Sequence, residues 1–252
     1  MALGKADIHV HSACGDGMAS VSQILAFADE KAGLSVVAIT DHDDLKGGFA
    51  AREAWARGKY RVEVVPGMEV TTLGGHLIAL FLEEPVASLK PLKETLEAVH
   101  RQGGLCIIPH PLNWLTRSVG HRTIMDVQRR RGSGVYFDGI QTANVAPGSR
   151  VKLKTAQRLN RQRYHLPEVG GSDAHFLPAV GSAYTLFEGE GAEDLRRAIL
   201  SGTTAGVNGR YPSIGEIGLG RFLRQQWRGI TVTPKAAGWG PTIWSFVKRL
   251  KP

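Results

Sequence analysis

The feature of this sequence that most limits its fold is a repeated alternation of short apolar runs with longer stretches of helical periodicity. Each apolar run has the length of a buried strand, and apolar residues recur at three- and four-residue spacing between the runs. This alternation is typical of β/α architectures, in which parallel strands are covered by helices. Strands are predicted at residues 7–10, 36–40, 62–65, 77–82, 105–108, 139–142 and 168–170.

Helix signals occupy the intervening stretches. Ser20 and Gln23 form a potential capping box ahead of an apolar stripe, and Gly33 can end that helix. Further helices are predicted over residues 92–103, 150–163 and 193–201. Strands and helices together predict an α/β fold.

Length and composition exclude several classes of protein. The chain has 252 residues, 42% apolar and 21% charged, enough for one barrel-sized core or two smaller ones. No apolar run approaches the roughly 18 residues of a transmembrane helix. Residues 1–6 lack the hydrophobic segment of a secretion signal, and Cys14 and Cys106 suggest neither a zinc knuckle nor a disulfide scaffold. We therefore expect a cytoplasmic protein.

The net charge of +8 is distributed unevenly along the chain. From residue 210 onward, eight Lys and Arg residues face only Glu216, which leaves a net charge of +1 for residues 1–209. Glycines, prolines and tryptophans also interrupt the pattern there. We predict a domain over residues 1–209 and a basic C-terminal extension over residues 210–252. Packing on the core, binding of a partner and peripheral contact with a membrane all stay open for this extension.

Nitrogen and carboxylate donors lie where the predicted strands end. His9 and His11 are two residues apart, which places both imidazoles on the same face of an extended strand. The carboxyl ends of parallel strands in a barrel meet at one rim, so donors that follow different strands converge in one pocket. Six histidines and three carboxylates exceed what one four-coordinate cation can use, so we expect two or three divalent cations bridged by a carboxylate. The donors are His9, His11, Asp16, His42, Glu69, His76, His110, Asp173 and His175.

The motifs that contain these donors occur in a distinctive order: DIHVHSACGDG, TDHD, GMEV followed by GHLIALF, PHP and GGSDAH. In this order, over roughly residues 5–205, the chain resembles the polymerase and histidinol phosphatase (PHP) superfamily. The resemblance implies a distorted seven-stranded β/α barrel and two or three divalent ions, with manganese, zinc and iron as the candidate metals. It further implies one ion on His9, His11, Glu69 and Asp173, a second that Glu69 shares with His76 and His110, and a third on Asp16, His42 and His175.

A metal-dependent phosphoesterase is the activity that the resemblance implies. Clustered cations lower the pKa of a water from about 15.7 toward neutrality and stabilise charge on a phosphoryl group. We expect a metal-activated hydroxide to hydrolyse a phosphomonoester, with nucleotides, nucleoside bisphosphates and other small phosphorylated molecules as candidate substrates. Two alternatives stay open: a nuclease acting on oligonucleotide ends, and a metal-stabilised module without catalysis.

Other polar residues flank these motifs. Asp41 and Asp43 adjoin His42 and are candidates to orient a ligating imidazole by a hydrogen bond, with capping of the next helix as the alternative. Residues 117–163 hold eleven Lys and Arg residues against two Asp residues. A solvated helix face explains such a charge run most simply, but the loop after His110 should open onto the same rim. The candidate phosphate contacts are Arg117, Arg122, Arg150 and Lys152.

Overall fold

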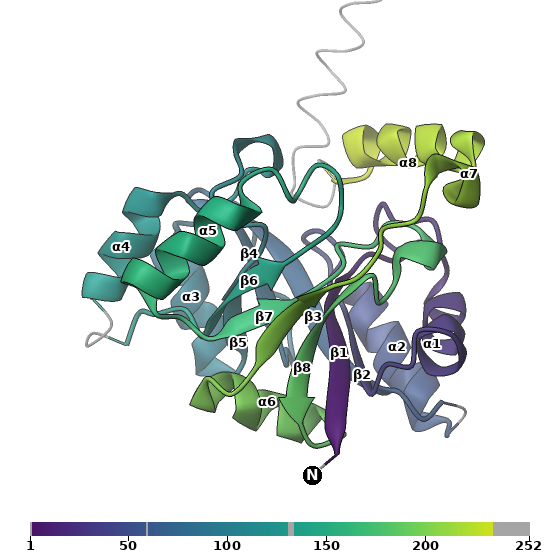
Figure 1. Ribbon diagram of the computed structural model, residues 1–252, viewed down its shortest axis with the longest axis horizontal. Coiled ribbons are helices and arrows are strands. Elements are labelled where there is room, and N and C mark those ends of the chain that lie inside the picture. Colours follow the sequence, from purple (N-terminus) through teal and green to yellow (C-terminus); the bar gives the residue numbers. More distant parts are fainter. Residues whose placement is uncertain (1, 59, 131–133, 234–252) are drawn as a thin grey trace, which may run out of the picture.

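The computed structural model describes residues 2–58, 60–130 and 134–233, and it shows helices arranged around a strongly curved sheet (Figure 1). The sheet has nine strands in the order β7-β6-β5-β4-β3-β2-β1-β8-β9. The strands are β1 (Leu3–Val10), β2 (Val36–Ile39), β3 (Glu63–Thr72), β4 (Gly75–Leu80), β5 (Leu105–Ile108), β6 (Gly139–Ala143), β7 (Glu168–Gly170), β8 (Ala183–Glu188) and β9 (Ala205–Asn208).

Parallel and antiparallel pairs both occur in this sheet. Strands β1 to β3 are mutually parallel, and so are β5 to β7. Strand β4 is antiparallel to both neighbours. Only Leu73 and Gly74 connect it to β3, a turn too short for a parallel crossover. The two ends of this strand order also come together, because Gly170 N of β7 donates a hydrogen bond to Thr185 Oγ1 of β8 at 2.9 Å. The sheet is therefore a nearly closed mixed barrel.

The predicted α/β barrel is confirmed, and strands occur at all seven predicted places. The structure adds β8 and β9, which the sequence analysis did not predict. In β8 buried and partly exposed residues alternate, and all four residues of β9 are partly or fully exposed. Neither strand therefore forms the continuous apolar run by which the others were identified.

The helices form an outer layer. The predicted capping box is present at the start of α1, where Ser20 Oγ accepts from Gln23 N at 3.3 Å and Ser20 N donates to Gln23 Oε1 at 2.9 Å. The helix ends before Gly33, at Glu30. The α-helices are α1 (Val21–Glu30), α2 (Lys46–Ala56), α3 (Leu92–Arg101), α4 (His121–Arg129), α5 (Leu153–Leu159), α6 (Ala192–Ser201), α7 (Ile214–Ile217) and α8 (Leu219–Thr231); the short helices are η1 (Trp114–Thr116), the π-helix η3 (Asn160–Tyr164) and η4 (Leu177–Ala179).

The buried apolar side chains of the described residues form three clusters. One cluster joins buried side chains of β1 to β5, β7 and β8 to Leu195 and Ile199 of α6, which lies at the lower end of the barrel (Figure 1). Helices α1 and α2 lie on one side, α3 to α5 on the other, and α7 and α8 at the upper end, toward which β1 runs. Among the described helices, none combines the length and the apolar character needed to cross a bilayer.

Candidate metal centre

The structure brings all nine predicted donors together at the end of the barrel near α7 and α8. Two bridges between loops and strands help to bring them together, Val10 with Ala174 and His42 with Glu69. His9 lies on β1, with His11 and Asp16 in the loop that follows; His42 follows β2; Glu69 and His76 lie on β3 and β4; His110 follows β5; and Asp173 and His175 follow β7.

Glu69 lies at the centre of the donors. Its Oε2 is 3.1 Å from His9 Nε2 and 3.3 Å from His42 Nδ1. Its Oε1 is 2.9 Å from both His76 Nδ1 and His110 Nε2. A carboxylate whose two oxygens face different imidazoles has the arrangement needed to bridge two cations.

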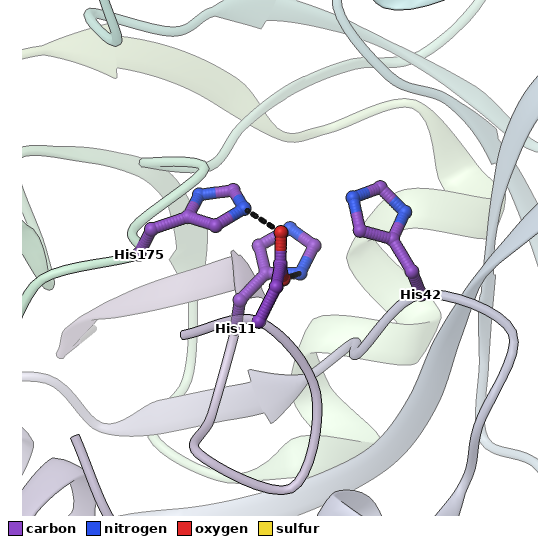
Figure 2. Close-up of side chains that lie close together, drawn as sticks. His11, His42 and His175 are labelled. Atoms are coloured by element: carbon purple, nitrogen blue, oxygen red, sulfur yellow. Dashed lines mark ion pairs between the residues drawn. The ribbon is translucent and has the colours of Figure 1, made fainter. Parts of the chain in front are cut away.

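The other two carboxylates lie on either side of His11. Asp173 Oδ1 is 3.4 Å from His11 Nε2, and Asp16 Oδ1 is 3.7 Å from His11 Nδ1. Figure 2 shows the rings of His11, His42 and His175 close to one carboxylate, with the ion pair between His175 Nε2 and Asp16 Oδ2, 3.2 Å apart, as a dashed line. The rings of His11 and His175 stack with their centroids 4.1 Å apart.

Electrostatics keep several donors in the form that binds metal. Burial would raise the pKa of Glu69, but His42, His9 and His76 hold it well below the usual range. Burial likewise opposes ionisation of Asp173, yet His9 and His11 hold its pKa well below normal. Burial lowers the pKa of His42 to about 3. Ionised carboxylates and neutral imidazoles are the forms that coordinate cations.

Unsatisfied atoms within the site test whether it fits a metal. Among the described residues, both ring nitrogens of His11, Nδ1 of His42 and Oδ1 of Asp16 are buried without a hydrogen-bond partner. Buried polar atoms without partners are costly, and a coordinated cation would satisfy them. The residues therefore fit divalent cations, and their buried clusters are consistent with a polynuclear metal site.

The donors form four overlapping groups within this site. His42 lies both with Asp16 and with the Glu69–His76 pair, whereas the resemblance to PHP proteins implied only the former grouping. The division of ligands among individual ions stays a prediction. The groups are His11, Asp16, His42 and His175; His9, His11 and Asp173; His9, Glu69 and His110; and His42, Glu69 and His76.

Asp41 and Asp43 hold loops around the site. Asp41 accepts hydrogen bonds from Ser12 N and Ser12 Oγ, both at 2.6 Å, and burial raises its pKa to about 6. Asp43 accepts from Thr71 N at 2.7 Å and from Ser88 Oγ at 2.6 Å. Helix α2 begins after Leu45 without a side-chain cap. The hydrogen bonds described for these two carboxylates thus go to loops and strands, to neither an imidazole nor the helix.

The sequence analysis missed Asp7, a buried carboxylate that positions the loop after β7. Asp7 accepts hydrogen bonds from Ser172 N at 2.9 Å, Ser172 Oγ at 2.5 Å and Gly181 N at 2.8 Å. This loop contains Asp173 and His175. A signal was available, because Asp7 precedes His9 by two residues and so shares its face of an extended strand.

Gln141 and two serines were also missed, although they contact the donors. Gln141 Oε1 accepts from His110 N at 2.8 Å, and its Nε2 donates to Gly171 O at 3.0 Å. Ser118 Oγ lies 2.7 Å from His110 Nδ1, and Ser149 Oγ donates to Asp173 Oδ2. Such contacts fix the orientation of metal ligands. A polar Gln141 within an apolar strand was the only signal in the sequence.

Asp7→Asn is expected to lower the free energy of unfolding by about 3 kcal/mol. The asparagine side chain has one acceptor oxygen in place of two, and its NH2 group would face Ser172 or Gly181, whose groups are themselves donors. Urea denaturation measures the loss. Asp44→Asn is the matched control, since that side chain is not one of the metal donors and its hydrogen bonds within the described part of the chain go to Lys46. Equal stability of the two variants would contradict the role assigned to Asp7.

A cavity of about 680 Å³ opens above the donors. Glu69, His110 and Asp173 lie on one side of it, while Phe222 and Gln225 of α8 lie on another. Helix α8 is held there by stacking of Phe222 with Phe176, centroids 6.4 Å apart, and by Arg228, which donates to the carbonyls of residues 13 and 15. The described part of the predicted extension therefore packs on the core and forms a wall of the cavity. The domain boundary at residue 209 stays a prediction, and residues 234–252 lie outside the described part.

The four candidate phosphate contacts are exposed. Arg117, Arg122, Arg150 and Lys152 are not among the described residues that line the cavity. The charge of Arg117 nevertheless acts on the site. Burial lowers the pKa of His76, but the negative charge of Glu69 outweighs burial and raises that pKa above its usual value. The positive charge of Arg117 reduces this rise. Phosphate binding stays a prediction for all four residues.

Comparison with known proteins identifies relatives of the chain. A family model described as PHP-associated matches residues 155–204. An uncharacterised protein of Methanocaldococcus jannaschii is 35% identical over 152 residues, which are 56% of this chain and 82% of that protein. The phosphoribosyl 1,2-cyclic phosphate 1,2-diphosphodiesterase of Eggerthella lenta is 37% identical over 101 residues, which are 37% of each chain.

A solved structure shares the fold. It is described as a two-domain protein from Bacteroides vulgatus that contains a predicted PHP-like metal-dependent phosphoesterase, and it matches with a TM-score of 0.65 at 20% identity. The match covers 82% of this chain and 65% of the Bacteroides chain, so this chain spans less than two thirds of that protein. Motif order, barrel, donor cluster and family match agree: the chain belongs to the PHP superfamily.

Proposed function

We propose that this chain is a metal-dependent phosphoesterase that hydrolyses a phosphomonoester. The observation that carries the proposal is the convergence of six imidazoles and three carboxylates beside one cavity, with five of the imidazoles within 3.4 Å of Glu69. Divalent cations bound by these donors would lower the pKa of a water toward neutrality and balance the charge of the phosphoryl group.

The residues of the chain hold and orient this site. Glu69 and Asp173 remain ionised because imidazoles surround them, which keeps negative charge available to cations. Asp7 and Asp41 hold the two loops that contain Asp173 and His11. Phe176 and Phe222 make part of the cavity wall apolar, so a bound ester is partly shielded from water there.

The cavity supports a small substrate over a long one. A volume of about 680 Å³ lies within the range of small-molecule sites, roughly 300–1,000 Å³. None of the described residues that line it is a lysine or an arginine. A nuclease that follows a strand relies on such cations to contact the backbone phosphates. We therefore favour a nucleotide or another small phosphorylated molecule as the substrate.

The test is release of phosphate by the full chain after removal of its metals and reloading with manganese, zinc or iron. We expect turnover of at least one ester among nucleotides, nucleoside bisphosphates and sugar phosphates, and none after chelation. A ribosyl cyclic phosphate belongs in the screen because the Eggerthella relative is named for such a substrate. Bound and stabilising metal without turnover of any ester would indicate a non-catalytic module, and turnover that chelators leave unchanged would refute metal dependence.

A further inference from the structure

Helix α8 has two chemically distinct faces. The face toward the barrel contributes Phe222 and the buried Gln225 to the cavity wall. Another face of the helix, which does not line the cavity, presents four large apolar side chains at helical spacing, which we call the α8 stripe. The α8 stripe consists of Leu219, Leu223, Trp227 and Ile230, which are 62%, 59%, 67% and 69% exposed.

Exposed apolar side chains also occur at the mouth of the cavity. Ile214 of α7 lines the cavity and is 56% exposed, so cavity wall and outer surface meet at this residue. Trp114 and Leu115 are 75% and 53% exposed and precede Thr116, another lining residue. The α8 stripe therefore forms one part of an apolar border beside the site.

The charge around the α8 stripe is positive. Helix α8 contains Arg221, Arg224 and Arg228 and no acidic residue. Glu216 is the one acidic residue in the described part of the extension, and it pairs with Arg210. Arg224 is exposed at the border of the stripe, whereas the exposed Arg221 lies on the other side of the helix, where it lines a hollow with Met18 and Phe176. A helix without acidic residues that carries an exposed apolar stripe and Arg224 beside it is complementary to a surface that combines hydrocarbon with negative charge.

We propose that the α8 stripe binds the surface of an anionic lipid bilayer and turns the mouth of the cavity toward the lipid headgroups. Basic amphipathic helices lie in the plane of the bilayer interface, with apolar side chains at the acyl boundary and arginines near anionic headgroups. A helix of 13 residues is about 20 Å long, which suits a position along the interface. Three of the four stripe residues are aliphatic. This composition favours hydrocarbon over nucleic acid, because single-stranded nucleic acid is bound by aromatic stacking.

Flotation of the full chain with lipid vesicles tests this surface. We expect the chain to float with vesicles of phosphatidylcholine and phosphatidylserine but not with phosphatidylcholine alone, and we expect added salt to weaken binding. The double variant Leu223→Ser with Trp227→Ser should reduce vesicle binding at least about tenfold, because it removes two of the four side chains that would insert into the bilayer. Leu200→Ser is the matched control, since Leu200 is 57% exposed on α6 at the opposite end of the barrel.

Each other outcome overturns the proposal. Failure to float with either type of vesicle, or equal binding by the double variant and the wild type, would show that the stripe is not a lipid contact. Salt-sensitive binding of single-stranded oligonucleotide that the double variant abolishes, without vesicle binding, would assign the surface to nucleic acid. A dimer that the double variant dissociates, again without vesicle binding, would assign it to a second copy of the chain. Near-ultraviolet circular dichroism verifies that both variants fold.

Discussion

Glu69→Gln is expected to lower phosphoester turnover by about 1,000-fold and to reduce the amount of metal bound to the purified chain. Both carboxylate oxygens face imidazoles, Oε1 towards His76 and His110 and Oε2 towards His9, His11 and His42. Glutamine has the same shape but lacks the negative charge and replaces one acceptor with a donor. It can therefore neither bridge two cations nor offset their charge. Steady-state kinetics and elemental analysis measure the two effects.

The control for this substitution is Glu83→Gln. Glu83 is an exposed glutamate that pairs with Arg52 away from the donors. The Glu83→Gln variant should therefore keep the turnover and the metal content of the wild type. Full turnover by Glu69→Gln would show that Glu69 is not needed for catalysis. Lost turnover with unchanged metal content would show that Glu69 acts in the reaction but is not needed to bind the metal.

Removal of the metals is expected to lower the Tm of the chain by about 10 °C. A ligand present at a thousand times its Kd stabilises the folded state by about 4 kcal/mol, which is worth roughly 10 °C in a chain of this size. Bound metal is expected to stabilise the fold because the buried donors are crowded together and several of their atoms have no other partner among the described residues. Calorimetry before and after chelation measures the shift, and adding the metal back should restore the Tm.

Glu69→Gln provides the internal comparison for this measurement. Its Tm should change far less on chelation, because the variant has lost the carboxylate shared by the donor groups. The same Tm with and without chelator in the wild type would contradict a stabilising metal centre. An equal decrease in wild type and variant would place the stabilising cation away from Glu69.

Local signals were sufficient to predict most of the fold. The capping box of Ser20 and Gln23 and the seven apolar strands depend on neighbouring residues and on burial on both faces, both of which the sequence displays. Strands β8 and β9 were missed because they are partly exposed at one side of the barrel. The place of β8 in the sheet depends on pairing with β1, whose residues lie far away in the sequence, and β9 in turn pairs with β8.

The sequence by itself determined which donors this protein contains and that they gather at one end of the barrel. Each donor follows or lies within a strand, and the apolar run that marks such a strand can be recognised from neighbouring residues alone. Only the tertiary structure decided how the donors are shared, with Glu69 among five imidazoles and His42 in two groups. It also decided that Asp7 secures the loop of Asp173 and that α8 closes one side of the cavity. These contacts join segments far apart in the chain, so they exist only once the barrel has closed, and no local pattern specifies them.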